Sequence, residues 1–167
     1  MKMKILFVCT GNTCRSAMAE GYFSLLAARA GFPELSAASC GLAALDGFPA
    51  EPNALRTAEK FSFSLATHRT RRFTREMGEE ADLIVCMTPS HVRGILSRMP
   101  FLAEKCRVLT QYANDAASSG GKGISDPFGD SEKVYENIFL EMKECLDNLF
   151  LDLVNKRKNH TEQTKKP

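Results

Sequence analysis

The sequence of 167 residues lacks several features that would assign it to common classes of protein. No apolar run reaches the roughly 18 residues of a membrane-spanning helix. The first apolar run, Ile5 to Cys9, is shorter than the about 7–15 residues that a secretory signal needs. The formal net charge is only +2, which is too small to suggest a nucleic-acid-binding protein. We therefore expect a cytoplasmic protein that binds neither nucleic acids nor membranes.

Motifs that would indicate a metal site or a dinucleotide site are also missing. The six cysteines form no Cys-x-x-Cys pair and the three histidines do not cluster near them, so we expect no metal site. No Gly-x-Gly-x-x-Gly occurs after the first apolar run, which argues against a dinucleotide-binding domain. A disulfide scaffold would be smaller and richer in cysteine. We therefore interpret four cysteines as small buried apolar residues: Cys40, Cys86, Cys106 and Cys145.

What the sequence does contain is an alternation of short apolar runs with segments of helical periodicity. The apolar runs predict strands at Lys4–Cys9, Leu35–Cys40, Asp82–Met87 and Cys106–Leu109. The periodic segments predict helices at Ser16–Ala30, Asn53–Phe61, Thr88 to near Met99, and Ser131 to about Lys156. This alternation is typical of an α/β fold with a parallel sheet covered by helices on both faces. We expect a single domain over residues 1–156, followed by a basic, disordered tail over 157–167.

Within the predicted domain, Gly31 is expected to end the first helix. Loops are predicted over residues 41–52 and 113–127, the second containing Ser118-Ser-Gly-Gly121. The last helix is expected to bury one apolar stripe, formed by Val134, Ile138, Met142, Cys145, Leu149 and Leu153.

The junction between the first strand and the first helix is where a ligand is expected, since α/β folds bind ligands beyond the carboxyl ends of their strands. Five residues separate Cys9 from Arg15 there. The backbone N–H groups of this loop can surround an anion, because Gly11 and Asn12 tolerate the unusual dihedral angles required. The helix N-terminus adds positive potential. We predict a phosphate-binding loop made of Thr10, Gly11, Asn12, Thr13, Cys14, Arg15 and Ser16.

In such a loop Cys9 would lie at the floor of an electropositive cup, where a thiolate is favoured. The thiolate can attack phosphorus to form a phosphocysteine, while Arg15 holds two phosphate oxygens. The alternative is a buried cysteine and an unrelated surface arginine. If the five-residue spacing between Cys9 and Arg15 were the only evidence, we would prefer that alternative. Here the spacing coincides with a strand–loop–helix junction, which favours the phosphate-binding loop.

A phosphatase also needs an acid that protonates the leaving group and then a base that activates water, and one carboxylic acid can do both. Asp126 is the candidate, because it lies in Ser125-Asp-Pro-Phe-Gly129 on the loop before the last helix. The alternative is that Asp126 and Pro127 only mark a turn before that helix.

Taken together, these features resemble the low-molecular-weight protein tyrosine phosphatase family. The resemblance runs from Lys4 to about Leu153, and it is carried by Cys9-Thr-Gly-Asn-Thr-Cys-Arg-Ser16 and by Asp126-Pro127. It implies a three-layer α/β/α fold with a four-stranded parallel sheet, no metal or organic cofactor, and a monomer that acts on phosphorylated proteins. It also implies catalytic roles for Cys9 as nucleophile, Arg15 as phosphate clamp and Asp126 as acid and then base.

Further residues gain roles from the same resemblance. Asn12, Ser16, Ser39 and His68 match positions of a supporting hydrogen-bond network, in which Ser16 also stabilises the Cys9 thiolate; an ordinary exposed histidine is the alternative for His68. Cys14 matches a cysteine that can form a disulfide with the nucleophile and protect it from irreversible oxidation. The alternative for Cys14 is a small residue packed under the loop.

Departures from the family pattern bear on the substrate. Ala17 replaces a usual proline, which matters little because alanine is a good helix former. Thr13 stands where phosphotyrosine enzymes tend to have Ile or Leu, and Leu45 where they have Trp or Tyr. The chain has no tryptophan, so Phe128 is the remaining aromatic wall. A branch that hydrolyses phosphoarginine on proteins resembles this chain at Thr13 and in Asp-Pro-Phe-Gly. We therefore expect phosphoarginine as substrate, with phosphotyrosine as the alternative.

Two other functions fit the same elements less well. A thioredoxin-coupled arsenate reductase shares the fold and loop but needs two more cysteines, six residues apart, after the third strand. Here Cys86 lies inside that strand and the next cysteine is Cys106. A binding module without activity would not require both Cys9 and Asp126.

Overall fold

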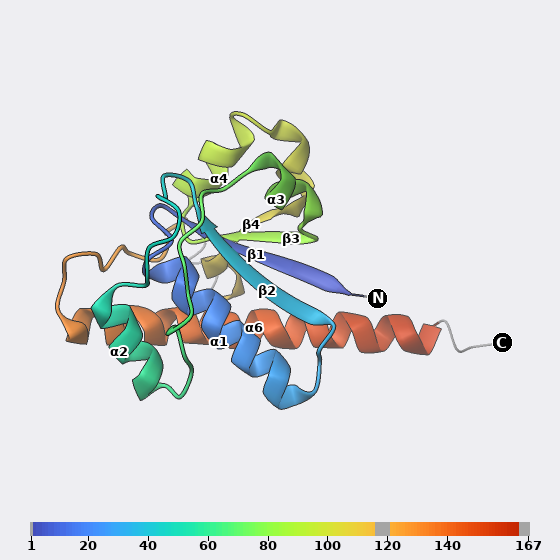
Figure 1. Ribbon diagram of the computed structural model, residues 1–167. Coiled ribbons are helices and arrows are strands. Elements are labelled where there is room, and N and C mark those ends of the chain that lie inside the picture. Colours follow the sequence, from blue (N-terminus) through green and yellow to red (C-terminus); the bar gives the residue numbers. More distant parts are fainter. Residues whose placement is uncertain (1, 116–120, 164–167) are drawn as a thin grey trace.

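A parallel four-stranded sheet forms the centre of the protein, and its strands end level with one another (Figure 1). The computed structural model describes residues 2–115 and 121–163. The strands are β1 (Met3–Cys9), β2 (Leu35–Gly41), β3 (Leu83–Cys86) and β4 (Cys106–Val108), in the order β2-β1-β3-β4. Cys9 is paired with Gly41, and Val8 with Cys86, so the carboxyl ends meet at one edge of the sheet.

Helices cover both faces of this sheet and make it the middle of three layers (Figure 1). One face carries α1 (Arg15–Ala30), α2 (Pro52–Lys60) and α6 (Glu132–Gln163), while a 3₁₀ turn, η2 (Leu109–Tyr112), contacts α6. The other face carries α3 (Arg75–Glu80), α4 (Pro89–Leu96) and a 3₁₀ helix, η1 (Pro100–Lys105). The predicted α/β/α fold with a four-stranded parallel sheet is thereby confirmed.

Two apolar cores follow from the alternation of side chains along β1. Ile5 and Phe7 face α1 and α6, and the Phe7 ring lies 5.7 Å from the ring of Phe23 on α1. Leu6 and Val8 face the opposite core under α3 and α4. A strand buried on both faces explains the continuous apolar run of β1 and holds Cys9, its last residue, in a fixed position.

Local signals placed several element boundaries correctly. Gly31 adopts a left-handed conformation with φ 72° at the end of α1, as predicted. Thr88 caps α4 by accepting a hydrogen bond from the backbone N–H of His91. Cys40, Cys86, Cys106 and Cys145 are all buried, as expected of small apolar residues.

The last helix differs from the prediction in length and in its buried face. It continues to Gln163, so the boundary predicted near Lys156 is too early and 157–163 is helical instead of a disordered tail. No proline or glycine interrupts that stretch, and Arg157 reaches Glu34 at 3.6 Å. The buried stripe is also centred differently, because Tyr135 and Phe139 are fully buried where Val134 and Ile138 are only partly so.

Among the described residues, three short elements were not predicted: α3, η1 and η2. Each has six residues or fewer, which is too short for a helical period to stand out in the sequence. Residues 116–120 of the predicted loop and 164–167 of the predicted tail lie outside the described residues. In the part of the chain that is described, no helix combines the length and apolar character needed to cross a membrane.

Candidate active site

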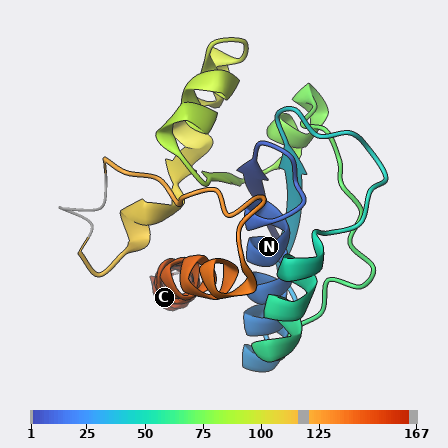
Figure 2. The same cartoon turned by 90° about the vertical axis from the view of Figure 1, so that its left-hand side faces the viewer.

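The loop between β1 and α1 lies at the carboxyl edge of the sheet, beside the segment that leads into α6 (Figure 2). The chain crosses from one side of β1 to the other between β2 and β3, and α/β folds bind ligands at such a switch point. A cavity of about 300 Å³ opens there. It is lined by Cys9, Thr10, Gly11, Thr13, Cys14, Arg15, Asp126 and Phe128.

Cys9 is buried at the base of this cavity, and hydrogen-bonding groups surround its sulfur. The Ser16 hydroxyl oxygen lies 2.9 Å from the Cys9 Sγ, and the backbone N–H of Asn12 donates to the same sulfur at 3.3 Å. Ser16 belongs to the first turn of α1, whose N-terminus adds positive potential. Donors aimed at a sulfur stabilise its thiolate, both before attack and when it leaves.

Asn12 gives the loop its shape. Its φ of 60° lies in the left-handed region, which asparagine adopts more readily than most residues. The buried Asn12 side chain donates to Ser16 at 2.9 Å and to Ser39 on β2 at 2.8 Å. It also accepts from the backbone N–H of Arg71 at 2.9 Å. A Cβ at Gly41 would lie 2.4 Å from the Thr10 carbonyl oxygen, so the loop can rest on β2 only because residue 41 is glycine.

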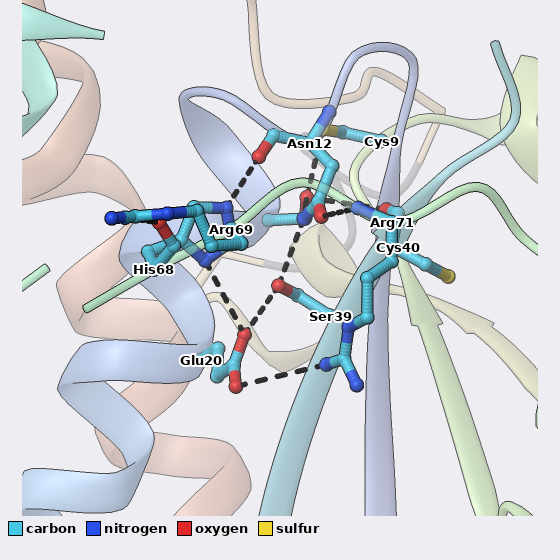
Figure 3. Close-up of polar contacts among 9 residues, drawn as sticks. Cys9, Asn12, Glu20, Ser39, Cys40, His68, Arg69 and Arg71 are labelled. Atoms are coloured by element: carbon cyan, nitrogen blue, oxygen red, sulfur yellow. Dashed lines mark hydrogen bonds and ion pairs between the residues drawn. The ribbon is translucent and has the colours of Figure 1, made fainter. Parts of the chain in front are cut away.

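A polar network extends from Asn12 to the far side of the loop (Figure 3). His68 Nε2 donates to the Asn12 carbonyl oxygen at 2.7 Å, and His68 Nδ1 lies 3.8 Å from Glu20. Glu20 also accepts from Ser39 and lies 4.0 Å from Arg71. The structure thus brings together all four predicted supporting residues, and the His68 side chain is only 6% exposed. Sequence reasoning missed Glu20 and Arg71.

Arg15 and Asp126 meet at the mouth of the cavity. The Arg15 guanidinium, only 5% exposed, donates to the Ile124 carbonyl oxygen at 2.9 Å and pairs with Asp126 at 3.1 Å. The Asp126 side chain is half exposed, and its other oxygen accepts from the backbone N–H of Phe128 at 3.1 Å. Asp126 is therefore held on a turn that lines the cavity, and its role as acid and base stays a prediction.

Cys14 lines the cavity and also contacts α6. Its sulfur lies 3.1 Å from the hydroxyl oxygen of Tyr135 and 3.5 Å from that of Thr13. Burial raises the pKa of the Cys14 thiol to about 11, although both hydrogen bonds oppose that rise. Cys9 and Cys14 are both free thiols in this structure, so the predicted disulfide remains a prediction. Tyr135 was not expected at the site.

His91 is a second buried residue that the sequence did not reveal. It lies on α4, with Nε2 2.9 Å from the Thr10 hydroxyl oxygen and Nδ1 3.0 Å from that of Thr88. Burial, and secondly the charge of Arg15, lower the pKa of His91 to about 4. The sequence offers one local feature, a histidine three residues after a capping threonine. This feature does not predict which residues the histidine ring contacts.

The predicted specificity residues are only partly brought together. Thr13 and Phe128 line the cavity, whereas Leu45 is 69% exposed and is not among the described residues that line it. A wall role for Leu45 therefore stays a prediction. Among the described residues, no group of three or more His, Cys, Asp or Glu side chains is placed to hold a metal ion.

Comparisons with known proteins agree with this geometry. The family model described as low molecular weight phosphotyrosine protein phosphatase matches residues 4–160. The chain is 35% identical to a protein-arginine-phosphatase of Bacillus subtilis over 157 residues, which cover 93% of this chain and 100% of the relative. The arginine phosphatase YwlE from Geobacillus stearothermophilus superposes with a TM-score of 0.85 at 30% identity, over 95% of this chain and 97% of that one.

A second solved structure bears on the chemistry of the loop. It is a YwlE mutant with a phosphorylated active-site serine, which matches with a TM-score of 0.85 and 33% identity, over 93% of this chain and 99% of that one. The family assignment made from the Cys9–Ser16 loop and Asp126-Pro127 is confirmed by the family model. The chain belongs to the low molecular weight phosphotyrosine protein phosphatase family.

Proposed function

We propose that this protein hydrolyses phosphoarginine on proteins through a phosphocysteine formed on Cys9. The observation that carries the proposal is the make-up of the cavity, which Thr13 and Phe128 line together with Cys9. The similarity to proteins named protein-arginine-phosphatase supports the same substrate. The phosphorylated serine in the YwlE mutant supports an intermediate on the residue that occupies the nucleophile position.

In the first step the Cys9 thiolate attacks phosphorus, so an S–P bond forms as the P–N bond of phosphoarginine breaks. The loop N–H groups and the Arg15 guanidinium bind the three equatorial oxygens and stabilise their charge. Asp126, at the mouth of the cavity, donates a proton to the leaving nitrogen.

In the second step water attacks the phosphocysteine, and Asp126, now ionised, takes a proton from that water. The S–P bond breaks and inorganic phosphate leaves. The Ser16 hydroxyl, 2.9 Å from the Cys9 sulfur, stabilises the thiolate that departs.

The walls of the cavity favour a guanidinium group over a phenol. A guanidinium is planar, charged and narrower than a phenyl ring, and it can stack on the Phe128 ring. The polar side chain of Thr13 suits such a group better than the Ile or Leu expected in a phosphotyrosine site. Asp126 can pair with the guanidinium as well as protonate it.

Other functions receive less support. A phosphotyrosine site would use two aromatic walls, but Phe128 is the one aromatic residue among the described residues that line the cavity. An arsenate reductase relay would need two accessible cysteines, but Cys86 is buried in β3 and Cys106 is buried in β4. That the protein acts as a monomer in the cytoplasm stays a prediction.

The test is a paired measurement of kcat/KM on one peptide carrying either phosphoarginine or phosphotyrosine, for wild type, Thr13→Ile and Thr13→Val. We expect wild type to prefer phosphoarginine, and Thr13→Ile to lose about 10–100-fold on that substrate because its extra bulk and lost hydroxyl both oppose a polar group. Thr13→Val keeps the shape and removes only the hydroxyl, so it separates the two causes. A strong wild-type preference for phosphotyrosine would refute the proposal.

A further inference from the structure

The ring of His91 is held between two threonine hydroxyls at the edge of the candidate active site. The ring nitrogens lie 2.9 Å from Thr10 Oγ1 and 3.0 Å from Thr88 Oγ1, and His91 is 7% exposed. The mechanism above uses neither His91 nor the Thr10 hydroxyl. A buried imidazole with both nitrogens engaged has a single orientation, so it can set the position of whatever it contacts.

Thr88 ties the ring to a rigid part of the fold. It caps α4, and the neighbouring Met87 carbonyl accepts from the Ile124 N–H at 2.8 Å. Gly123 packs so closely that a Cβ there would lie 2.6 Å from the Thr88 Cα. The same segment carries Asp126 and supplies the Ile124 carbonyl that holds Arg15. His91 therefore connects the first residue of the phosphate loop to the segment that bears the acid.

Thr10 occupies the outer part of the cavity. It is exposed and lines the cavity with Asp126 and Phe128, whereas Asn12 and Ser16 of the same loop are buried. In the proposed mechanism the inner N–H groups of the loop bind the phosphoryl group, so a side chain at the rim would face the leaving group. The Thr10 hydroxyl is thus placed beside the atoms that distinguish one phosphorylated residue from another.

Hydrogen-bond capacity decides what this hydroxyl can recognise. A threonine hydroxyl has one donor and two acceptor sites, and the contact with His91 uses only one of them. At least one acceptor site remains free whichever ring nitrogen carries the proton. A guanidino group presents several N–H donors, whereas the ring of a phosphotyrosine presents none.

We propose that His91 is a positioning residue that fixes the Thr10 hydroxyl as a hydrogen-bond acceptor for the guanidino N–H groups of the leaving group. The inference rests on the proposed phosphoarginine activity and adds a second polar residue, besides Thr13, to its specificity. The pKa of His91, lowered to about 4 by burial and by Arg15, keeps the ring uncharged near neutral pH. A neutral ring orients the hydroxyl without repelling a cationic leaving group.

The experiment measures kcat/KM on phosphoarginine and phosphotyrosine peptides for Thr10→Val, His91→Phe and the double variant. Each single variant should lose about tenfold on phosphoarginine, and the double variant should lose no more than either single one, because both remove the same contact. In each variant kcat/KM on phosphotyrosine should fall by less than kcat/KM on phosphoarginine, so the ratio of the two values should shift toward phosphotyrosine. Inhibition by inorganic phosphate should weaken by less than turnover of phosphoarginine, since the contact is to the leaving group.

Two further variants guard the interpretation. Thr57→Val is the matched control, because Thr57 is a buried threonine whose hydroxyl has no partner among the described residues. This variant should leave kcat/KM unchanged on both substrates. His91→Gln keeps an amide that can reach Thr10, so it should retain more phosphoarginine activity than His91→Phe. If His91→Phe does not fold, Thr10→Val and His91→Gln carry the comparison.

Three results would overturn the inference: equal losses on both substrates, additive losses in the double variant, or inhibition by phosphate that weakens as much as turnover of phosphoarginine. The proposed function is tested separately, by which of the two substrates the wild-type protein prefers. The role of His91 and Thr10 is tested by comparing each variant with wild type on the same substrate.

Discussion

Replacing Asn12 by alanine tests whether the shape of the phosphate loop depends on this one side chain. The substitution removes two hydrogen bonds that Asn12 donates, to Ser16 and Ser39, and one that it accepts from the Arg71 N–H. The two serines keep other partners, since Ser16 reaches Cys9 and Ser39 reaches Glu20. The backbone N–H of Arg71 loses the acceptor that it has in the structure.

The expected cost follows from these contacts. The two donated bonds contribute about 1 kcal/mol each, and the unpaired Arg71 N–H costs about 1 kcal/mol or more. Alanine at a φ of 60° adds about 1 kcal/mol of backbone strain. We therefore expect Asn12→Ala to lower the free energy of unfolding by about 3–5 kcal/mol, a large part of the about 5–15 kcal/mol typical of a domain.

Urea unfolding followed by circular dichroism measures this change, with Asn12→Gly as the matched variant. Glycine loses the same hydrogen bonds but adopts positive φ freely, so it should be more stable than the alanine variant by about 1 kcal/mol. Both variants should keep the wild-type dependence of the unfolding free energy on urea concentration. A loss below about 1 kcal/mol for Asn12→Ala, or a glycine variant less stable than the alanine one, would refute this account of the loop.

Three further predictions concern the chemistry. Arg15→Lys should lower kcat/KM for p-nitrophenyl phosphate by about 100-fold or more, because a lysine cannot hold two phosphate oxygens and the Ile124 carbonyl together; a loss below about tenfold would contradict the clamp. Asp126→Asn should lower kcat by about 100-fold and let phosphoenzyme accumulate in acid-quenched samples, whereas an unchanged kcat would exclude Asp126 as acid and base. Hydrogen peroxide should oxidise Cys9 to a sulfenic acid, and the Cys14 sulfur should then attack the sulfenic sulfur and displace its oxygen as water, which leaves a disulfide between Cys9 and Cys14. Mass spectrometry should show this form and its reversal by dithiothreitol, and Cys14→Ser should be inactivated irreversibly. Reversible inactivation of Cys14→Ser would contradict that role.

The part of the site that sequence reasoning could predict is the part that is contiguous in the chain. A phosphate cradle needs successive N–H groups, so Cys9, Arg15 and the glycine and asparagine between them stand together and can be recognised. Asp126 could be predicted for a related reason, because an Asp-Pro turn before a helix is a local pattern. The structure places it 3.1 Å from Arg15, although Arg15 begins α1 and Asp126 comes shortly before α6.

The residues that were missed act through contacts distant in sequence. His91 reaches Thr10 across 81 positions, and Tyr135 reaches Cys14 across 121. Nothing in the local pattern around either residue encodes that partner. Tyr135 was also missed because tyrosine carries a polar hydroxyl group. In a helical pattern such a residue is readily assigned to the border of the apolar face instead of its centre. Glu20 lies one turn after Ser16 on α1, and in the sequence it is only a charged residue beside the buried residues of that helix.

In the proposed mechanism, the ion pair between Arg15 and Asp126 links phosphate binding to proton supply. Before substrate binds, the Asp126 carboxylate balances the buried Arg15 guanidinium, while Ile124 holds the other arm of that guanidinium. An incoming phosphoryl group presents stronger negative charge to the same N–H groups, so it displaces the carboxylate. The displaced carboxylate stays on its turn, held by the Phe128 N–H, and now faces the leaving group beyond the phosphorus. Once released from Arg15, the Asp126 carboxyl group is available to the leaving group as the proposed acid. In the proposed mechanism, substrate binding and release of the acid are therefore one exchange of partners at Arg15.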